Sequence, residues 1–133
     1  MNENNYLLDT HVLLNFFNSE VSTNSFWIET IMNKDNNIYL SRISFWEITI
    51  KKSLGKLQTT LSIDEFEYYC NLNNIEIIDF DLNCLEILET LPFIHRDPFD
   101  RYLISLSIKN NLKFLTIDSQ ISKYTSTTEL QLG

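Results

Sequence analysis

Short apolar runs, none longer than a buried strand, alternate with longer amphipathic segments along the chain. The clearest runs lie at 6–8, 38–40, 75–78 and 114–117, and each is expected to form a strand. A last strand is expected near Leu130. The segments between them carry apolar residues at the spacing of a helix face. Helices are therefore expected at 10–17, 24–33, 44–54, 62–71, 82–90 and 98–109. Strands that alternate with helices favour an α/β domain with a mainly parallel sheet.

The length and composition suit a single domain covering 1–133. Of the 133 residues, 44% are hydrophobic and 13% are aromatic, which is enough for a real core. No apolar run approaches the ~20 residues needed to span a bilayer, and the N-terminus shows no signal-peptide pattern. The cytoplasm is the expected compartment, where Cys70 and Cys84 would stay reduced and act as small apolar residues.

The helix patterns also predict which side chains face the core and where helices end. Because the chain has only two glycines, Asn110 or Asn111 is expected to end the helix at 98–109 in the left-handed conformation. Gly55 is expected to end the helix at 44–54, whose core-facing stripe would be Ile43, Trp46, Ile50 and Leu54.

Two acids come directly after strands of the expected sheet. Asp9 follows the run at 6–8, and Asp118 follows the run at 114–117. Active sites of open parallel sheets gather at the carboxyl ends of the strands. Glu47 also sits beside a core segment, because it follows an apolar pair. Carboxylates brought together at such an edge repel one another, and a hard cation such as Mg²⁺, Mn²⁺ or Ca²⁺ relieves that repulsion.

Each of these acids, taken alone, can also be explained as a residue that caps a helix. Capping does not explain why three of them lie beside core segments instead of on exposed helix faces, which favours a shared site. Asp9 and Asp118 are candidate N-caps, and so is Asp97, which precedes Pro98 and would place Asp100 at the third helical position. Glu47 is the candidate partner of Ser44 in a Ser44-x-x-Glu47 capping box.

The net charge of −8, with a pI of about 4.6, has the wrong sign for a general nucleic-acid binder. The basic residues are unevenly placed, because none lies between Lys56 and Arg96. Those that flank the candidate acids in sequence are possible RNA contacts, namely Lys51, Lys52, Arg96 and Arg101.

Hydroxyls stand beside the same acids on Thr10, Ser44 and Thr116. They could orient the carboxylates or simply cap helices. His95 precedes Arg96 and could contact substrate, but an ordinary loop histidine is the favoured interpretation.

Four blocks of the sequence carry a more specific pattern. They are LLDTHVLL at 7–14, SFWEITIK at 44–51 followed by LGKL at 54–57, HRDPFDR at 95–101, and TID at 116–118. In this order and at these distances they resemble the PIN domain family, and in particular its bacterial VapC-type toxins. The resemblance spans nearly the whole chain, and no motif acid is missing.

The resemblance implies a PIN-like three-layer α/β/α sandwich with a mainly parallel central sheet. It also implies an Mg²⁺-dependent (or Mn²⁺-dependent) endoribonuclease that hydrolyses RNA phosphodiesters. Such a chain is the toxin of a toxin–antitoxin pair, usually a homodimer, and binds a cognate antitoxin protein. Asp97 is implied as an auxiliary acid at a helix start, with Asp100 one turn along facing the strand ends. The implied catalytic and metal-binding acids are Asp9, Glu47, Asp100 and Asp118.

Two other function classes remain open at the level of sequence. A non-catalytic PIN-fold protein-binding module would be expected to have lost one of the acids, and none is lost. A phosphoryl-transfer α/β enzyme that forms an aspartyl phosphate would be expected to carry Asp-x-Asp after its first strand. This chain has Asp9-Thr10-His11 there, which counts against that class.

Overall fold

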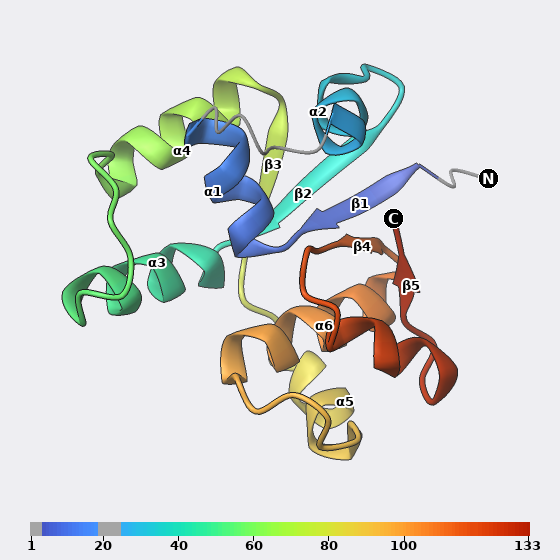
Figure 1. The fold of residues 1–133 in the computed structure, drawn as a ribbon. Coiled ribbons are helices and arrows are strands. Elements are labelled where there is room, and N and C mark those ends of the chain that lie inside the picture. The colour runs from blue at the N-terminus through green and yellow to red at the C-terminus, as the bar shows by residue number, and fades with distance from the viewer. Residues whose placement is uncertain (1–3, 19–24) are drawn as a thin grey trace.

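Five parallel strands form one sheet at the centre of the described chain (Figure 1). The computed structural model describes residues 4–18 and 25–133. The strand order across the sheet is β3-β2-β1-β4-β5. In chain order the strands are β1 (Asn5–Leu8), β2 (Asn37–Ser41), β3 (Ile75–Ile78), β4 (Lys113–Leu115) and β5 (Gln131–Leu132).

Helices cover both faces of this sheet, as Figure 1 shows. No helix in the described part of the chain is long and apolar enough to cross a bilayer. One face packs against α1 (Thr10–Asn18), α2 (Ser25–Met32), α3 (Ile43–Ser53) and α4 (Ile63–Leu72). The other face packs against α5 (Cys84–Thr90), α6 (Pro98–Asn110) and the 3-10 helix η1 (Ile121–Ser126).

The two cores follow from the alternation of side chains along the strands. Leu8 and Leu115 point into the core beneath α1 and α3, whereas their neighbours Leu7 and Phe114 point into the core beneath α6. All four side chains are fully buried. Both faces of the sheet are therefore apolar, which matches the continuous apolar runs in the sequence. The expected three-layer α/β/α sandwich with a parallel central sheet is confirmed.

The register between β1 and β4 brings distant parts of the chain together. Leu8 pairs with Leu115, and the backbone N–H of Asp9 donates to the Leu115 carbonyl at 2.9 Å. The residues that follow these two strands, Asp9 and Thr116, therefore lie side by side at the carboxyl edge of the sheet. The strand expected at 114–117 is shorter than predicted, because β4 ends at Leu115.

The expected core-facing stripe of α3 is wrong. Trp46 is 59% exposed and Leu54 is 62% exposed, and the buried face is Ser44, Phe45, Glu47 and Ile48. The apolar periodicity fails here because two buried positions of this helix carry polar side chains. A prediction based only on the spacing of apolar residues therefore chooses a face of α3 that is turned toward solvent.

The helix ends expected at 98–109 are confirmed. Asp97 is the N-cap of α6, and its carboxylate accepts the backbone N–H of Phe99 at 2.8 Å. Asn111 is the C-cap, with φ 55° and ψ 45°, so it and not Asn110 takes the left-handed conformation. Asparagine tolerates this region better than most residues with a Cβ.

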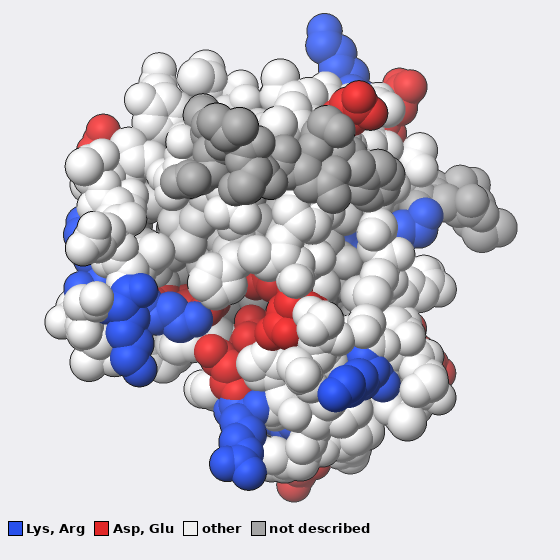
Figure 2. Space-filling view, viewed as in Figure 1, with Lys and Arg blue, Asp and Glu red and all other residues white. Residues whose placement is uncertain are grey.

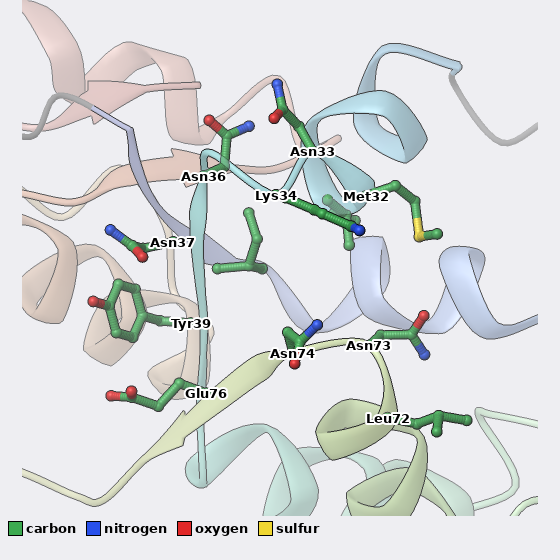
Figure 3. Close-up of a pocket in the computed structure, with 12 residues that line it drawn as sticks. Met32, Asn33, Lys34, Asn36, Asn37, Tyr39, Leu72, Asn73, Asn74 and Glu76 are labelled. Atoms are coloured by element: carbon green, nitrogen blue, oxygen red, sulfur yellow. The ribbon is translucent and has the colours of Figure 1, made fainter.

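A cavity of about 470 Å³ lies at the opposite, amino-terminal edge of the sheet (Figure 3). Several asparagines line it, and the side-chain amides of two of them donate hydrogen bonds to backbone carbonyls of the surrounding turns. Asn36 donates to the Thr30 carbonyl and Asn73 donates to the Tyr69 carbonyl. The cavity is therefore a product of turn geometry, and the acids selected from the sequence all lie at the other edge.

The left-handed cap gives a test of the fold. Replacing Asn111 by alanine is expected to lower the free energy of unfolding by about 1 kcal/mol, because alanine lacks the short polar side chain that lets asparagine adopt a positive φ at lower cost. Asn111→Gly is the matched control and should be at least as stable as the parent. Urea denaturation of the three proteins measures the difference. Equal stability of the alanine and glycine variants would contradict the assigned conformation.

Candidate metal centre

Four acids converge at the carboxyl edge of the sheet. Asp9 lies in the turn between β1 and α1, Glu47 on α3, Asp100 in the first turn of α6, and Asp118 after β4. Glu47 is fully buried, Asp9 and Asp100 are nearly so, and Asp118 is partly exposed. Acids gather in a hollow of the molecular surface, with basic side chains at its border (Figure 2).

Asp100 links two groups of potential metal ligands. Ligand atoms of Glu47, Asp97 and Asp100 lie within 4.8 Å of one another, and so do those of His95, Asp100 and Asp118. The sequence-based expectation that Asp100 faces the strand ends agrees with this placement. Two overlapping groups of this kind can hold one or two cations at adjacent positions.

Glu47 is held by side chains from two helices. The Thr10 hydroxyl donates to Glu47 Oε1 at 2.6 Å, and Lys51 Nζ donates to Oε2 at 2.5 Å. The hydroxyl of Ser44 lies 2.8 Å from that of Thr10. The capping-box explanation of Ser44 and Glu47 is wrong, because the N-cap of α3 is Arg42, whose side chain makes no capping hydrogen bond. Instead, both residues face the site.

Asp9 has one satisfied and one unsatisfied oxygen. Its Oδ2 accepts the Thr116 hydroxyl at 2.5 Å. Its Oδ1 is buried and has no hydrogen-bond partner among the described residues. Burial raises the pKa of Asp9, and the charge of Glu47 adds to the rise, whereas the Thr116 hydrogen bond and the charge and backbone N–H of His11 oppose it. A buried carboxylate oxygen without a donor is unusual in a folded protein, and it is the kind of atom that a cation satisfies.

Asp100 carries the strongest electrostatic signal of the site. Burial, followed by the negative charges of Asp9, Asp97 and Glu47, raises its pKa to about 8. Near neutral pH, without a cation, this carboxyl group therefore holds a proton. The charge of Lys51 acts in the opposite direction but does not offset burial and the neighbouring carboxylates.

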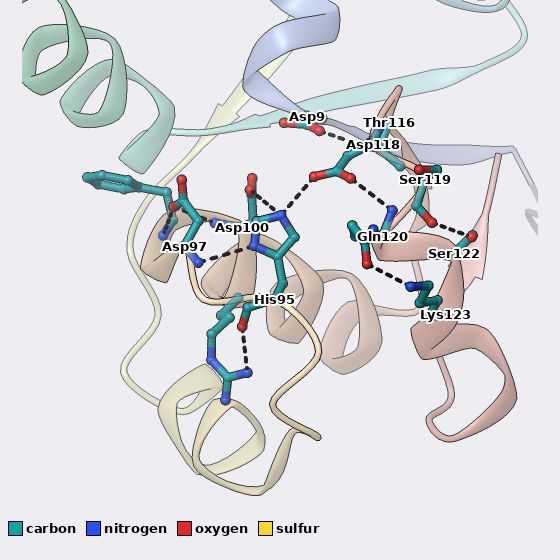
Figure 4. Close-up of polar contacts among 12 residues, drawn as sticks. Asp9, His95, Asp97, Asp100, Thr116, Asp118, Ser119, Gln120, Ser122 and Lys123 are labelled. Atoms are coloured by element: carbon teal, nitrogen blue, oxygen red, sulfur yellow. Dashed lines mark hydrogen bonds and ion pairs between the residues drawn. The ribbon is translucent and has the colours of Figure 1, made fainter. Parts of the chain in front are cut away.

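His95 bridges the second ligand group (Figure 4). Its Nε2 lies 2.7 Å from Asp118 Oδ2 and 3.2 Å from Asp100 Oδ2. The backbone N–H of Asp97 donates to Nδ1 at 3.1 Å, which assigns the proton of the neutral ring to Nε2. Burial alone would raise the pKa of Asp118, but hydrogen bonds from His95 and from the Gln120 backbone lower it. Sequence reasoning ranked His95 too low, and its place beside the HRDPFDR acids was the available signal.

Asp97 has two roles at the start of α6. Its Oδ1 caps the helix, and its Oδ2 lies 3.5 Å from Lys51 Nζ. Burial alone would lower the pKa of Lys51, but the hydrogen bond to Glu47 and the charges of Asp97 and Asp100 raise it. Lys51 is therefore a charged counter-ion within the acid cluster.

The expectation that Arg101 contacts RNA needs correction. This residue is only 6% exposed, and its guanidinium donates to backbone oxygens and to the Tyr124 hydroxyl. Its donors are thus used inside the protein. Lys52 and Arg96 are exposed, as a phosphate contact requires. The backbone oxygens that Arg101 binds belong to Leu88, Leu91, Pro92 and His95.

Comparison with known proteins identifies the family. Residues 6–126 match the PIN domain family. The chain belongs to the PIN domain family. No curated protein matches the sequence of this PIN domain.

Two solved structures share its fold. One is a chain of VapBC2 from Rickettsia felis, bound to a DNA fragment from its promoter. It is 19% identical, with 96% of each chain covered and a TM-score of 0.68. The other is a chain of a toxin–antitoxin complex from Klebsiella pneumoniae, 17% identical, with 86% of this chain and 87% of that chain covered and a TM-score of 0.57.

The raised pKa of Asp100 gives a second test. Between about pH 4 and pH 8 the folded state keeps a proton on Asp100 that the unfolded chain releases. This group therefore destabilises the metal-free protein increasingly as pH rises through that window. In EDTA, Asp100→Asn is expected to be more stable than the parent by about 2 kcal/mol at pH 8, with the difference shrinking toward pH 4.

Urea denaturation at several pH values measures this difference. Asp64→Asn is a suitable control, because Asp64 lies in the first turn of α4, outside the acid cluster. Parallel stability curves for the parent and Asp100→Asn across pH 4 to 8 would rule out the shifted carboxyl group.

Proposed function

We propose that this PIN domain is a divalent-metal-dependent endoribonuclease and the toxin of a toxin–antitoxin pair. The observation that carries the proposal is the buried Oδ1 of Asp9, which has no hydrogen-bond partner among the described residues although Asp9 interacts electrostatically with Glu47 and Asp100. Burying like charges together is unfavourable unless an opposite charge compensates. Stability alone does not explain such an arrangement, whereas binding a cation does.

The available ligand atoms fit Mg²⁺ or Mn²⁺. The four acids Asp9, Glu47, Asp100 and Asp118 offer hard carboxylate oxygens, which these ions prefer. A cation bound there would activate water and stabilise the charge that develops on a phosphodiester. The reaction proposed is hydrolysis of an RNA phosphodiester without a covalent enzyme intermediate.

The surrounding side chains position the acids for this role. Thr116 fixes Asp9 through Oδ2 and leaves Oδ1 for a cation. Thr10 fixes one oxygen of Glu47, and the ammonium of Lys51 offsets the charge of the other. The Nε2–H of His95 donates to Asp118 Oδ2 and fixes the orientation of that carboxylate. These contacts orient the ligands before the substrate arrives, which lowers the reorganisation needed during the reaction.

The assignment as a toxin rests on the fold comparisons and on charge. Both similar structures are described as toxin–antitoxin assemblies. The net charge of −8 suits a protein partner with basic side chains that can enter the acid cluster. The proposed partners are a cognate antitoxin, an RNA substrate and a second copy of this chain, and the proposed compartment is the cytoplasm.

Metal binding should release a proton. At pH 7 Asp100 is protonated in the metal-free protein, and a cation that uses this carboxylate must displace that proton. Titration calorimetry with Mn²⁺ in buffers of different ionisation enthalpy is expected to show release of about one proton at pH 7 and less at pH 9. Asp100→Asn should bind more weakly and release none. Proton release that persists in this variant would assign the proton to another group.

Cleavage itself is the direct test. Total cellular RNA is incubated with the protein and Mg²⁺, with EDTA, with Asp9→Asn, and with the control Asp64→Asn. Discrete fragments are expected with the parent and with Asp64→Asn, and none with EDTA or Asp9→Asn, because Asp9 is a proposed cation ligand. Cleavage that survives Asp9→Asn would contradict this site. A folded, metal-loaded protein that leaves every RNA intact would favour the non-catalytic binding module.

A further inference from the structure

Two aromatic rings from different helices meet at the border of the acid cluster. The ring centroids of Trp46 on α3 and Phe99 on α6 lie 5.3 Å apart, with the planes at 88°. Trp46 directly precedes Glu47, and Phe99 directly precedes Asp100. Trp46 remains 59% exposed despite this contact. A large aromatic side chain that is exposed beside the candidate site is available for a binding role.

The aromatic pair spans the same gap as the ion pair between Lys51 and Asp97. Lys51 Nζ on α3 lies 3.5 Å from Asp97 Oδ2 at the start of α6. The other oxygen of Asp97 accepts the backbone N–H of Phe99 at 2.8 Å. Figure 4 shows Asp97 and Asp100 together at this end of α6. An unbroken series of contacts therefore joins Trp46 and Phe99 to the carboxylates.

The geometry of the pair leaves an aromatic surface free. In an edge contact one ring presents only its rim to the other, so at least one face of the indole has no contact with Phe99. A pair that served only to hold α3 against α6 would be expected to bury both rings. Trp46 instead keeps most of its surface accessible, which is what a stacking platform requires.

The charge of the region favours stacking as a source of RNA affinity. Arg101 is buried and uses its donors on the backbone, and Lys51 is paired with Glu47 and Asp97. Of the basic residues selected from the sequence, Lys52 and Arg96 remain exposed, and a site with so few such cations gains less from phosphate contacts than a broadly basic surface does. Base–aromatic stacking does not depend on charge, because every base has a π face. An indole beside the carboxylates would hold a base next to the phosphate that is cut.

We propose that Trp46, supported by Phe99, stacks on an unpaired base of the RNA substrate. The inference rests on the proposed ribonuclease function and adds a positioning residue to it. A base inside a duplex has no free face, so the substrate class is RNA with single-stranded or looped nucleotides at the cut. A protein partner covering the same rings is the competing occupant, and the experiment distinguishes the two.

Tryptophan fluorescence provides a readout that does not need cleavage. Besides Trp46 the chain holds only Trp27, on α2. In the Trp27→Phe variant, Trp46 is therefore the only tryptophan. Titration with decaadenylate, with Ca²⁺ in place of Mg²⁺, is expected to quench this emission. The same strand annealed to its complement should quench it far less. Equal quenching by the duplex, or none by the single strand, would overturn the proposal.

Kinetics provides the second readout. Trp46→Ala is expected to raise KM for single-stranded RNA about tenfold, with kcat within a few-fold of the parent, because stacking contributes to binding. Trp46→Phe should recover most of the loss. The control is Leu82→Ala, a similarly exposed apolar residue between β3 and α5, which should leave both constants unchanged.

Each failure has a distinct signature. A Trp46→Ala protein with lowered thermal stability and kcat but unchanged KM would show that the pair is a structural clamp. Quenching by the purified antitoxin but not by RNA would assign the surface to the protein partner. If Asp9→Asn abolishes cleavage while Trp46→Ala leaves KM unchanged, the ribonuclease function stands and this inference fails. Cleavage that is unchanged in Asp9→Asn would contradict the proposed ribonuclease site itself.

Discussion

Repulsion among buried carboxylates is the constraint around which this end of the molecule is built. Three of the four acids are almost inaccessible to water, and Asp100 keeps a proton as a result. Each contact that relieves the repulsion comes from a different part of the chain. Thr116 follows β4, Thr10 begins α1, Lys51 lies on α3 and His95 precedes α6. The site therefore exists only when both layers of helices are packed on the sheet.

Arg101 shows how the fold supports the site from beneath. Its guanidinium binds carbonyls of the segment between α5 and α6, including that of His95. Tyr124 of η1 accepts from both Arg101 and the backbone N–H of His95. These hydrogen bonds fix a segment that has no regular structure of its own. A buried arginine that binds several carbonyls is thus a positioning element for the imidazole above it, in a motif where sequence alone suggested a phosphate contact.

The sequence predicted the parts of the structure in which local pattern and tertiary environment agree. The apolar runs gave β1 and β3, and Asp97 and Asn111 marked the ends of α6. Prediction failed where a polar residue occupies a buried position. Glu47 occupies a core position of α3, so the apolar stripe there selected the wrong face and placed Trp46 inside. The contacts of His95 with Asp118 and of Arg101 with Tyr124 were also missed, because each joins residues 23 positions apart.

The cluster without a cation is compensated in three partial ways. Lys51 offsets charge at Glu47 and Asp97, the Nε2 proton of His95 bridges Asp100 and Asp118, and a proton remains on Asp100 itself. None of these reaches Asp9 Oδ1, which stays unpartnered. The protein can therefore fold without a cation, but one carboxylate oxygen is left without a hydrogen-bond partner among the described residues. In the proposed metal site, a cation bound among these carboxylates would gain most at the oxygen that no side chain serves, so we expect occupancy of the site to depend most on Asp9.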